Sequence, residues 1–320
     1  MSESKQENSP APYDDEIDLR ELFRVLWAGK WLIGGITFAA AMIAVAVALM
    51  LPNIYRAEAL LAPNDQQGTG GLSALAAQYG GLASLAGINL GSGSADKTAL
   101  GLEILRSRKF VSEFIERHDI LVPLMAAEDW DAESGELKID PRVYDLATDR
   151  WMRDVKPWWP PPRKTTPSLQ EAHKVFMGIL SVSQDNKSGF VSIAVEHYSP
   201  TVAKQWVDWL VGDINSSIMQ QDVAEAEQGI AYLNEQIEST SLADLRNVFF
   251  KLIEEQTKIV MLAKVSPEYM LRTIDPAVIP ELKVRPNRAL ICVLGTLLGG
   301  MLSVLGVLIR HYAFRTVEDA

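Results

Sequence analysis

The sequence predicts an α+β membrane protein in which two transmembrane helices flank one large domain. Residues 31–51 and 289–309 are apolar runs, each of 21 residues, without a single Asp, Glu, Lys or Arg. Between them, residues 52–288 hold alternating segments typical of strands and, at about 199–265, a long region with helical spacing. A 21-residue helix is about 31 Å long, close to the hydrocarbon thickness of a bilayer. The large domain is therefore expected on one side of a membrane.

The first apolar run is expected to be a retained transmembrane helix rather than a cleaved signal sequence. It follows an acidic segment, residues 1–30, and is longer than the apolar region of a signal peptide, about 7 to 15 residues. Within that segment, Ile17, Leu22, Val25 and Leu26 recur at helical spacing. They predict a short amphipathic helix that leads into the membrane.

Basic residues beside the two runs predict the orientation of the chain. Arg20, Arg24 and Lys30 precede the first run, and Arg310 and Arg315 follow the second. Because Lys and Arg are enriched in cytoplasmic flanks, both termini, including the tail at 310–320, are expected in the cytoplasm. In the inner membrane of a bacterium, residues 52–288 would then be periplasmic.

The chain is acidic, which argues against a nucleic-acid partner. Its formal net charge is −11, of which −3 belongs to residues 1–30, with four basic and seven acidic side chains, and −8 to residues 52–288. Cys292 is the only cysteine and lies in the second apolar run. The large domain therefore has no internal disulfide, and its composition permits an oxidising compartment.

Periodicity and turn signals divide the large domain into elements. Alternation predicts a strand at 55–61, and helical spacing predicts a helix at 95–117 with a bend near Ser107. A further helix is expected at 168–180, followed by a β-hairpin at about 181–196.

A long helix is expected next. Ser199 suits the N-cap position and Pro200 the first turn, and no other proline occurs before Pro267. The predicted helix at 199–239 would be roughly 60 Å long, with a second helix from about 242 to 262 as the return leg. Apolar residues spaced by three and four form a narrow seam suited to helix packing, within one chain or between subunits. The seam, which we favour as a subunit contact, comprises Val223, Ala226, Ile230, Leu233 and Ile237.

Both apolar runs carry small residues at four-residue spacing. Such rows lie on one helix face and let two backbones approach closely. Packing between the two spans of one chain and packing against another subunit or a membrane partner are equally compatible with this pattern. The rows are Ala40, Ala44 and Ala48 in the first run, and Gly295, Gly299 and Ser303 in the second.

The sequence contains no pattern for catalysis, for a cofactor or for a metal site, so a non-enzymatic protein is expected. There is no G-x-S-x-G, no phosphate-binding G-x-x-x-x-G-K-[ST], and no H-x-x-x-H spacing. His197, at the end of a predicted strand, is the best lone candidate for a base, although a structural role is favoured. The acidic residues between Glu128 and Glu136 are expected to form a solvated loop. The tail at 310–320 is too short for a kinase domain.

Two segments keep alternative interpretations. The near-repeat from Gly70 to Gly87 suits a mobile flap or a weak helix between flexible linkers, and the second is favoured. The segment from Trp151 to Pro162 combines aromatic, proline and basic residues, which suits either glycan contact or a rigid loop, and the loop is favoured. Contact of either segment with glycan or polymerase stays open.

Several segments together resemble the Wzz chain length determinant family of polysaccharide co-polymerases, in its kinase-free form. Residues 16–22 lead into the first run and Tyr55-Arg56-Ala57 follows it, while 103–108 and 199–203 also look like family segments. The most specific stretch resembles the family's Pro/Gly element, which overlaps the second span. Its residues are Pro276, Pro280, Pro286, Arg288, Gly295 and Gly299.

The resemblance implies a homo-oligomeric ring or bell whose subunits have a small α/β base near the membrane and long protruding helices. It implies a scaffold that regulates the length of O-antigen or a similar surface polysaccharide made by a Wzy-type polymerase from lipid-linked units. An alternative function is a membrane activator or adaptor of a separate tyrosine kinase in capsule or exopolysaccharide export. Neither function needs a cofactor.

Overall fold

The computed structural model describes residues 19–64, 93–153, 155, 164–239 and 243–318. The chain divides into two compact units, one formed by Met1–Leu51 with Pro286–Ala320 and the other by Pro52–Arg285. Each is described by itself.

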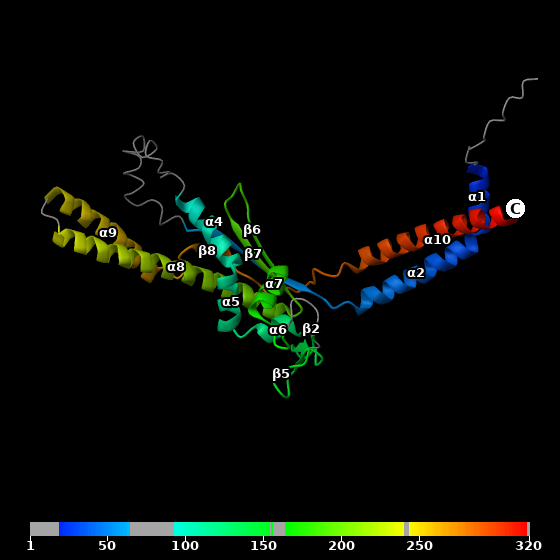
Figure 1. Cartoon of the computed structure of the whole chain (residues 1–320), viewed down its shortest axis with the longest axis horizontal. Helices are drawn as coiled ribbons and strands as arrows, with labels where there is room; N and C mark the ends of the chain where they lie inside the picture. The colour runs from blue at the N-terminus through cyan, green and yellow to red at the C-terminus, as the bar shows by residue number, and fades with distance from the viewer. Residues whose placement is uncertain (1–18, 65–92, 154, 156–163, 240–242, 319–320) are drawn as a thin grey trace, which may run out of the picture. The chain divides into compact units, whose positions relative to one another are not determined.

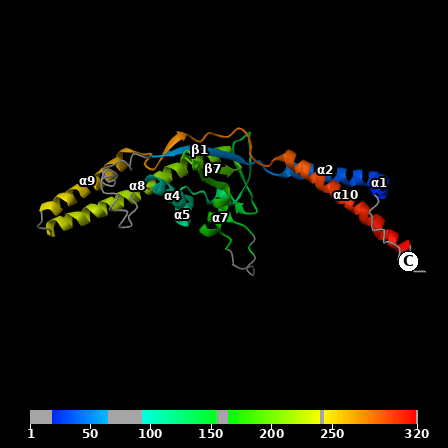
Figure 2. The same ribbon diagram turned by 90° about the horizontal axis from the view of Figure 1, so that it is seen from above.

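The first unit is a set of helices, of which α2 and α10 are strongly apolar. Helix α1 (Leu19–Ala28) is followed by α2 (Lys30–Met50), and α10 (Arg288–Glu318) lies beside α2 in both views (Figures 1 and 2). Lys30–Met50 and Arg288–His311 are long and apolar enough to cross a membrane, with mean hydropathies of 2.4 and 2.3. These bounds lie within two residues of the predicted runs, but α10 continues as a helix to Glu318. No helix-breaking residue follows Ile309 to end it sooner.

The second unit is built around an antiparallel sheet in the order β6-β7-β1-β8. Its strands are β1 (Tyr55–Pro63), β6 (Leu180–Gln184), β7 (Val191–His197) and β8 (Leu271–Asp275). The predicted strand and hairpin are confirmed. Side chains that alternate along β1 and β7 are buried opposite one another, in the pairs Ala57 with Val195, Ala59 with Ile193 and Leu61 with Val191.

Strand β8 was not expected, because the prolines after it argue against a central strand. It lies at the edge of the sheet, pairs only with β1 among the described strands, and ends directly before Pro276. An edge strand tolerates a nearby proline because its outer backbone groups need no partner strand.

Helices cover the buried face of this sheet. They are α4 (Gly93–Arg106), α5 (Arg108–Arg117), α6 (Leu121–Met125), α7 (Leu169–Ile179) and the first half of α8 (Pro200–Ser239). Phe114, Phe176 and Trp206 bring α5, α7 and α8 together, with ring centroids 5.4 and 6.0 Å apart along this series. Ser107 lies between α4 and α5, and its hydroxyl caps α5 by accepting a hydrogen bond from the Phe110 N–H. The predicted bend near Ser107 is therefore confirmed.

The acidic segment after α6 forms a hairpin rather than the loop that the sequence predicted. Strand β2 (Ala127–Trp130) pairs with β3 (Leu137–Ile139), and Asp129 stands opposite Lys138. In the turn, the Glu133 N–H donates to the Asp131 carboxylate, which holds the pKa of Asp131 below its ordinary value. Turn bonds and cross-strand charge therefore order a segment whose composition alone suits a solvated loop. A second small hairpin joins β4 (Tyr144–Asp145) and β5 (Arg150–Trp151).

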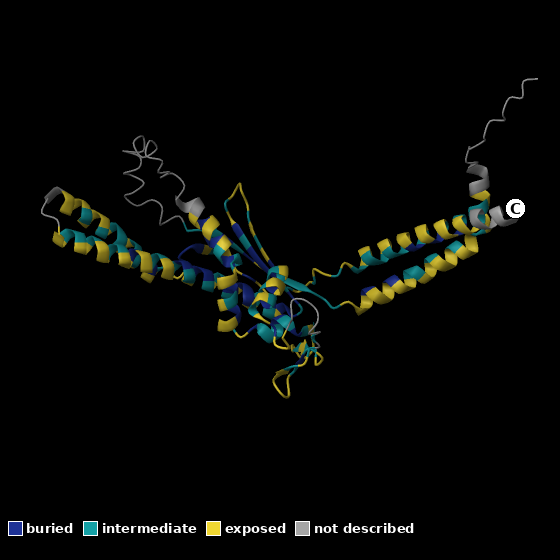
Figure 3. Cartoon of the chain, in the orientation of Figure 1, coloured by how far each residue is buried: buried dark blue, intermediate teal, exposed yellow. Residues whose placement is uncertain are grey.

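Helix α8 and helix α9 (Ala243–Val265) run side by side as a hairpin (Figures 1 and 2). The predicted long helix is confirmed, and α8 begins one residue after the expected cap, Ser199. All but one of its buried residues lie in its first half, between Pro200 and Ile218, and its second half is largely half-buried or exposed (Figure 3). The N-terminal half of α8 therefore packs against the sheet, while its C-terminal half packs mainly against α9.

One buried polar side chain joins α8 to the edge strand. Asn215 is 3% exposed; its Oδ1 accepts bonds from the Met270 and Leu271 N–H groups, both at 2.8 Å. Its Nδ2 donates to the Leu271 carbonyl at 3.0 Å and to the Val211 carbonyl at 3.1 Å. All four hydrogen-bonding positions of the amide are thus filled. We call this set of bonds the Asn215 latch.

Candidate functional site: the paired apolar helices and the helical hairpin

Helices α2 and α10 approach one another through the small-residue rows. A Cβ built on Gly299 would lie 2.3 Å from the Ala40 Cβ, and one built on Gly295 would lie 2.6 Å from the Ala44 Cβ. No side chain larger than hydrogen fits at either glycine without moving a helix. The rows of one chain therefore meet each other, which is one of the two arrangements that the sequence left open.

Polar and apolar contacts extend this interface toward α1. Ser303 is 1% exposed, and its hydroxyl lies 3.4 Å from that of Thr37 while it donates to the Gly300 carbonyl. Further along, a Cβ on Gly29 would lie 2.8 Å from a methyl of Val307. Ala44 and Ala48 are buried as well. Thr37 and Gly29 were missed by the sequence analysis, although Thr37 lies three residues before Ala40 and so on the same helix face.

The outward faces of the pair are apolar and exposed. Figure 3 colours most of α2 and about half of the described part of α10 as exposed. Large side chains point outward from α2 and from α10. They include Phe38, Met42 and Ile43 on α2, and Leu298, Met301 and Leu302 on α10. This surface suits lipid or a membrane protein, because neither requires polar groups from it.

The Pro/Gly element runs from the edge strand into α10. Pro276 is exposed, while Pro280, Pro286 and Arg288 are half-buried. Near its middle, the Val284 N–H donates to the Ile54 carbonyl at 2.9 Å, and Ile54 pairs with Arg285. The element is thus held to the residue directly before β1, and α10 then begins at Arg288 with its first turn capped by the Asn287 side chain.

The seam on α8 faces α9 within one chain. Ala226 is 1% exposed, and Val223, Ile230, Leu233 and Ile237 are half-buried. Beside the seam, a Cβ on Gly229 would lie 3.8 Å from the Gln256 side chain of α9, an ordinary contact. The four half-buried seam residues are not fully covered by α9, so part of each of these four remains available to a second protein.

The histidine that the sequence singled out has a structural role. His197 is 6% exposed; its Nε2 donates to the Pro123 carbonyl at 3.2 Å and its Nδ1 accepts from the Ser199 N–H at 3.1 Å. These two bonds require the neutral tautomer with hydrogen on Nε2. Among the described residues, no three His, Cys, Asp or Glu side chains come together as metal ligands would.

Burial of His197 makes folding sensitive to mild acid. Burial lowers the pKa of His197 from its ordinary 6.5, so the unfolded chain binds this proton first as pH falls. We expect the apparent Tm of the full chain in detergent to fall as pH drops below about 6.5. This fall would begin at a pH well above the range in which the carboxylates titrate. A His197→Asn variant, which keeps an acceptor for the Ser199 N–H, should be less stable at pH 7.5 but lose less Tm between pH 7.5 and 5.

Parallel Tm profiles for the wild type and His197→Asn across that range would contradict this assignment. Profiles at pH 7.5 and 8.5 provide the internal control, because both states hold His197 neutral there.

Two segments with open interpretations lie mostly outside the described residues. The Gly70 to Gly87 repeat lies wholly outside them, as do Trp158, Trp159 and the three prolines. Beside the Trp151 to Pro162 segment, Arg153 donates to the Glu171 carboxylate and to the carbonyls of Lys164 and Thr165, each at 2.6 Å. Trp151, in β5, packs edge-on against Tyr144.

The fold defines the class of this protein: an α+β protein with two helices near its ends that are long and apolar enough to span a membrane. Comparison with known families adds that residues 15–118 match the family model described as Wzz, chain length determinant protein. Residues 245–312 match the model described as GNVR, a G-rich domain on putative tyrosine kinase. The predicted resemblance to the Wzz chain length determinant family is therefore confirmed over residues 15–118.

Known proteins and structures give weaker likenesses. No curated protein matches the chain. A full-length bacterial polysaccharide co-polymerase is 15% identical, covering 94% of this chain and 99% of its own, with a TM-score of 0.39. A fragment of WzzB, a polysaccharide co-polymerase from Salmonella Typhimurium, is 11% identical over 73% of this chain and 100% of its own, with a TM-score of 0.34. At these scores, neither structure bears on function.

Proposed function

We propose that this chain is a non-enzymatic polysaccharide co-polymerase of a bacterial inner membrane. It would set the length of O-antigen in lipopolysaccharide, or of a similar surface polysaccharide, that a Wzy-type polymerase builds from lipid-linked units. The observation that carries the proposal is the Wzz match over residues 15–118, which includes α1, α2 and β1. The apolar outer faces of α2 and α10 are the surfaces through which it would contact the polymerase.

The proposal includes an orientation and an assembly. Both termini would be cytoplasmic and residues 52–288 periplasmic, as the basic flanks suggest.

Subunits would form a ring or bell, with contacts along the α8–α9 hairpin. Support comes from the incomplete cover of the seam and from apolar residues on the outside of α9, where Leu245, Val248 and Leu252 are 38 to 50% exposed and share one helix face. Chemical crosslinking of the purified chain in detergent should give a ladder of bands, and a single monomer band would contradict the assembly.

A second candidate function rests on the other family match. The GNVR match over residues 245–312 supports a membrane activator or adaptor of a separate tyrosine kinase in capsule or exopolysaccharide export. The two candidates predict different phenotypes in a deletion strain.

The deciding experiment removes the gene and then restores it on a plasmid. Under the first function, lipopolysaccharide bands on a gel should change from a clustered to a broad length distribution, and the plasmid should restore the cluster. Unchanged bands would exclude length control of O-antigen. Loss of tyrosine-phosphorylated protein on an immunoblot, together with loss of exported polysaccharide, would instead support the kinase adaptor.

A further inference from the structure

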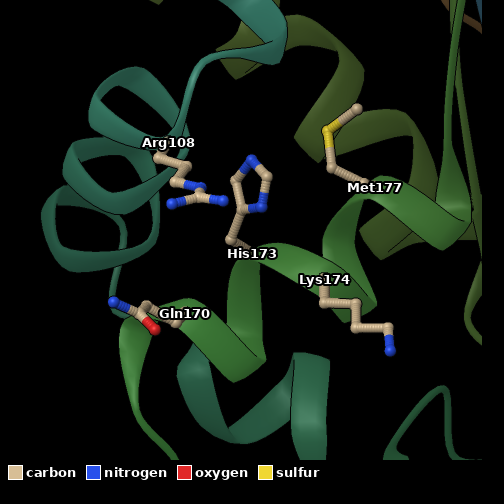
Figure 4. Close-up of a pocket in the computed structure, with 5 residues that line it drawn as sticks. All are labelled: Arg108, Gln170, His173, Lys174 and Met177. Carbon is tan, nitrogen blue, oxygen red and sulfur yellow. The ribbon is translucent and has the colours of Figure 1, made fainter.

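A cationic cavity lies between α5 and α7 of the second unit. It has a volume of about 350 Å³ and is lined by Arg108, Gln170, His173, Lys174 and Met177. Figure 4 shows Arg108 reaching from α5 toward His173 of α7, with Gln170 and Lys174 extending to opposite sides of His173 and the Lys174 ammonium pointing away from Arg108. None of the described residues that line the cavity is acidic.

The charges in this cavity are not neutralised by the protein. Within the described part of the chain, no carboxylate is close enough to Arg108 or Lys174 to form an ion pair. The nearest acidic residue in sequence, Glu171, binds Arg153 at 2.6 Å. In a domain whose net charge is −8, a cluster of unpaired cations raises the local potential for an anion.

The other lining groups match a sugar better than a bare inorganic anion. Gln170 offers an amide that can both donate to and accept from hydroxyl groups, and Met177 offers an apolar wall on which the C–H face of a ring can pack. The cavity volume is within the range of small-molecule sites, about 300 to 1,000 Å³. His173 donates from Nε2 to the Arg106 carbonyl at 3.2 Å, which orients its ring in the cavity.

We propose that this cavity binds an acidic sugar residue, with Arg108 contacting the oxyanion of that residue, Gln170 contacting a hydroxyl, and Lys174 adding positive potential at the rim. The oxyanion is a carboxylate or a phosphate, which share the same hydrogen-bond acceptors. The inference rests on the proposed function only for the source of the sugar, which would be the polysaccharide itself.

The test measures binding by the purified full-length chain in detergent. The probes are tri-galacturonic acid for a carboxylate, glucose 1-phosphate for a phosphate, and maltotriose and inorganic phosphate as a neutral sugar and a bare anion. The Arg108→Gln/Lys174→Gln variant removes two charges from the cavity. The matched Lys187→Gln/Lys251→Gln variant removes two from exposed positions without ion pairs in the described structure.

At least one acidic sugar should bind saturably, and the cavity variant should weaken its Kd by about tenfold or more while the matched variant leaves it within about twofold. Which acidic sugar binds identifies the oxyanion. Equal weakening by both variants, binding of inorganic phosphate as tight as that of the sugars, or no binding of either acidic sugar would each overturn the proposal. These outcomes are independent of the deletion experiment. If neither acidic sugar binds but the deletion strain shows the expected broad length distribution, the cavity proposal fails and length control stands.

Discussion

Replacing Asn215 by Leu should be among the most destabilising single substitutions in the second unit. The change leaves the Met270 and Leu271 N–H groups and the Leu271 carbonyl without the partner that the latch provides. A buried backbone group without a partner costs about 1–3 kcal/mol, so the total loss is about 3 kcal/mol or more. For a unit of this size, that corresponds to a Tm lower by about 10 °C.

The measurement is thermal unfolding of the full chain in detergent, followed by far-UV circular dichroism. Asn234→Leu is the matched control, because it makes the same change on the exposed side of the same helix. Asn215→Asp, which keeps both acceptor contacts and loses the two donor contacts, should fall between them. A Tm for Asn215→Leu equal to that of the Asn234→Leu control would disprove the latch.

Replacing Gly299 by Leu should force α2 and α10 apart. A Cβ at Gly299 already falls 2.3 Å from the Ala40 Cβ, so a larger side chain can be placed only if one helix moves. Overpacking of this kind costs about 1–3 kcal/mol, enough to reduce the population of paired helices by about tenfold. Gly306→Leu is the control, because nothing lies within 4 Å of the position where its Cβ would be.

Helix pairing can be measured with a crosslink between Thr37→Cys and Ser303→Cys, whose hydroxyl oxygens are 3.4 Å apart. Cys292 is first replaced by Ala, and a short thiol crosslinker is added to membranes. After proteolysis between the helices, the two fragments should stay in one band for the parent and for Gly306→Leu, but not for Gly299→Leu. Crosslinks that form only between two chains would show that the rows meet across subunits instead. If the spans must pair to engage a polymerase, Gly299→Leu should also broaden the length distribution of the polysaccharide.

Local patterns along the chain predicted most of the secondary structure. The apolar runs, the strand at Tyr55–Pro63, the bend at Ser107 and the start of α8 at Pro200 all depend on short-range chemistry, namely hydropathy, alternation and capping. The hairpin at residues 127–139 was missed because its order comes from cross-strand pairing and turn bonds rather than from apolar alternation. Strand β8 was missed because only its pairing with β1 identifies it.

The candidate site was predictable in its residue types but not in its partners. Four-residue spacing of small residues indicated a close contact, yet it could not distinguish a contact within one chain from one between chains. The latch had a weak signal, because Asn215 lies on α8 between the buried residues Ile214 and Ile218. The cationic cavity had none, because Arg108 and His173 are 65 residues apart and lie on different helices.

The sequence by itself determined that two helices near the ends can cross a membrane and that an α+β unit with a long helix lies between them. Those properties follow from the hydropathy and periodicity of consecutive residues, which need no knowledge of distant contacts. Only the tertiary structure decided which faces meet: Gly299 with Ala40, Asn215 with the edge strand, and α5 with α7. Each of these contacts joins residues far apart in the chain, and their positions depend on how whole elements pack rather than on local preference.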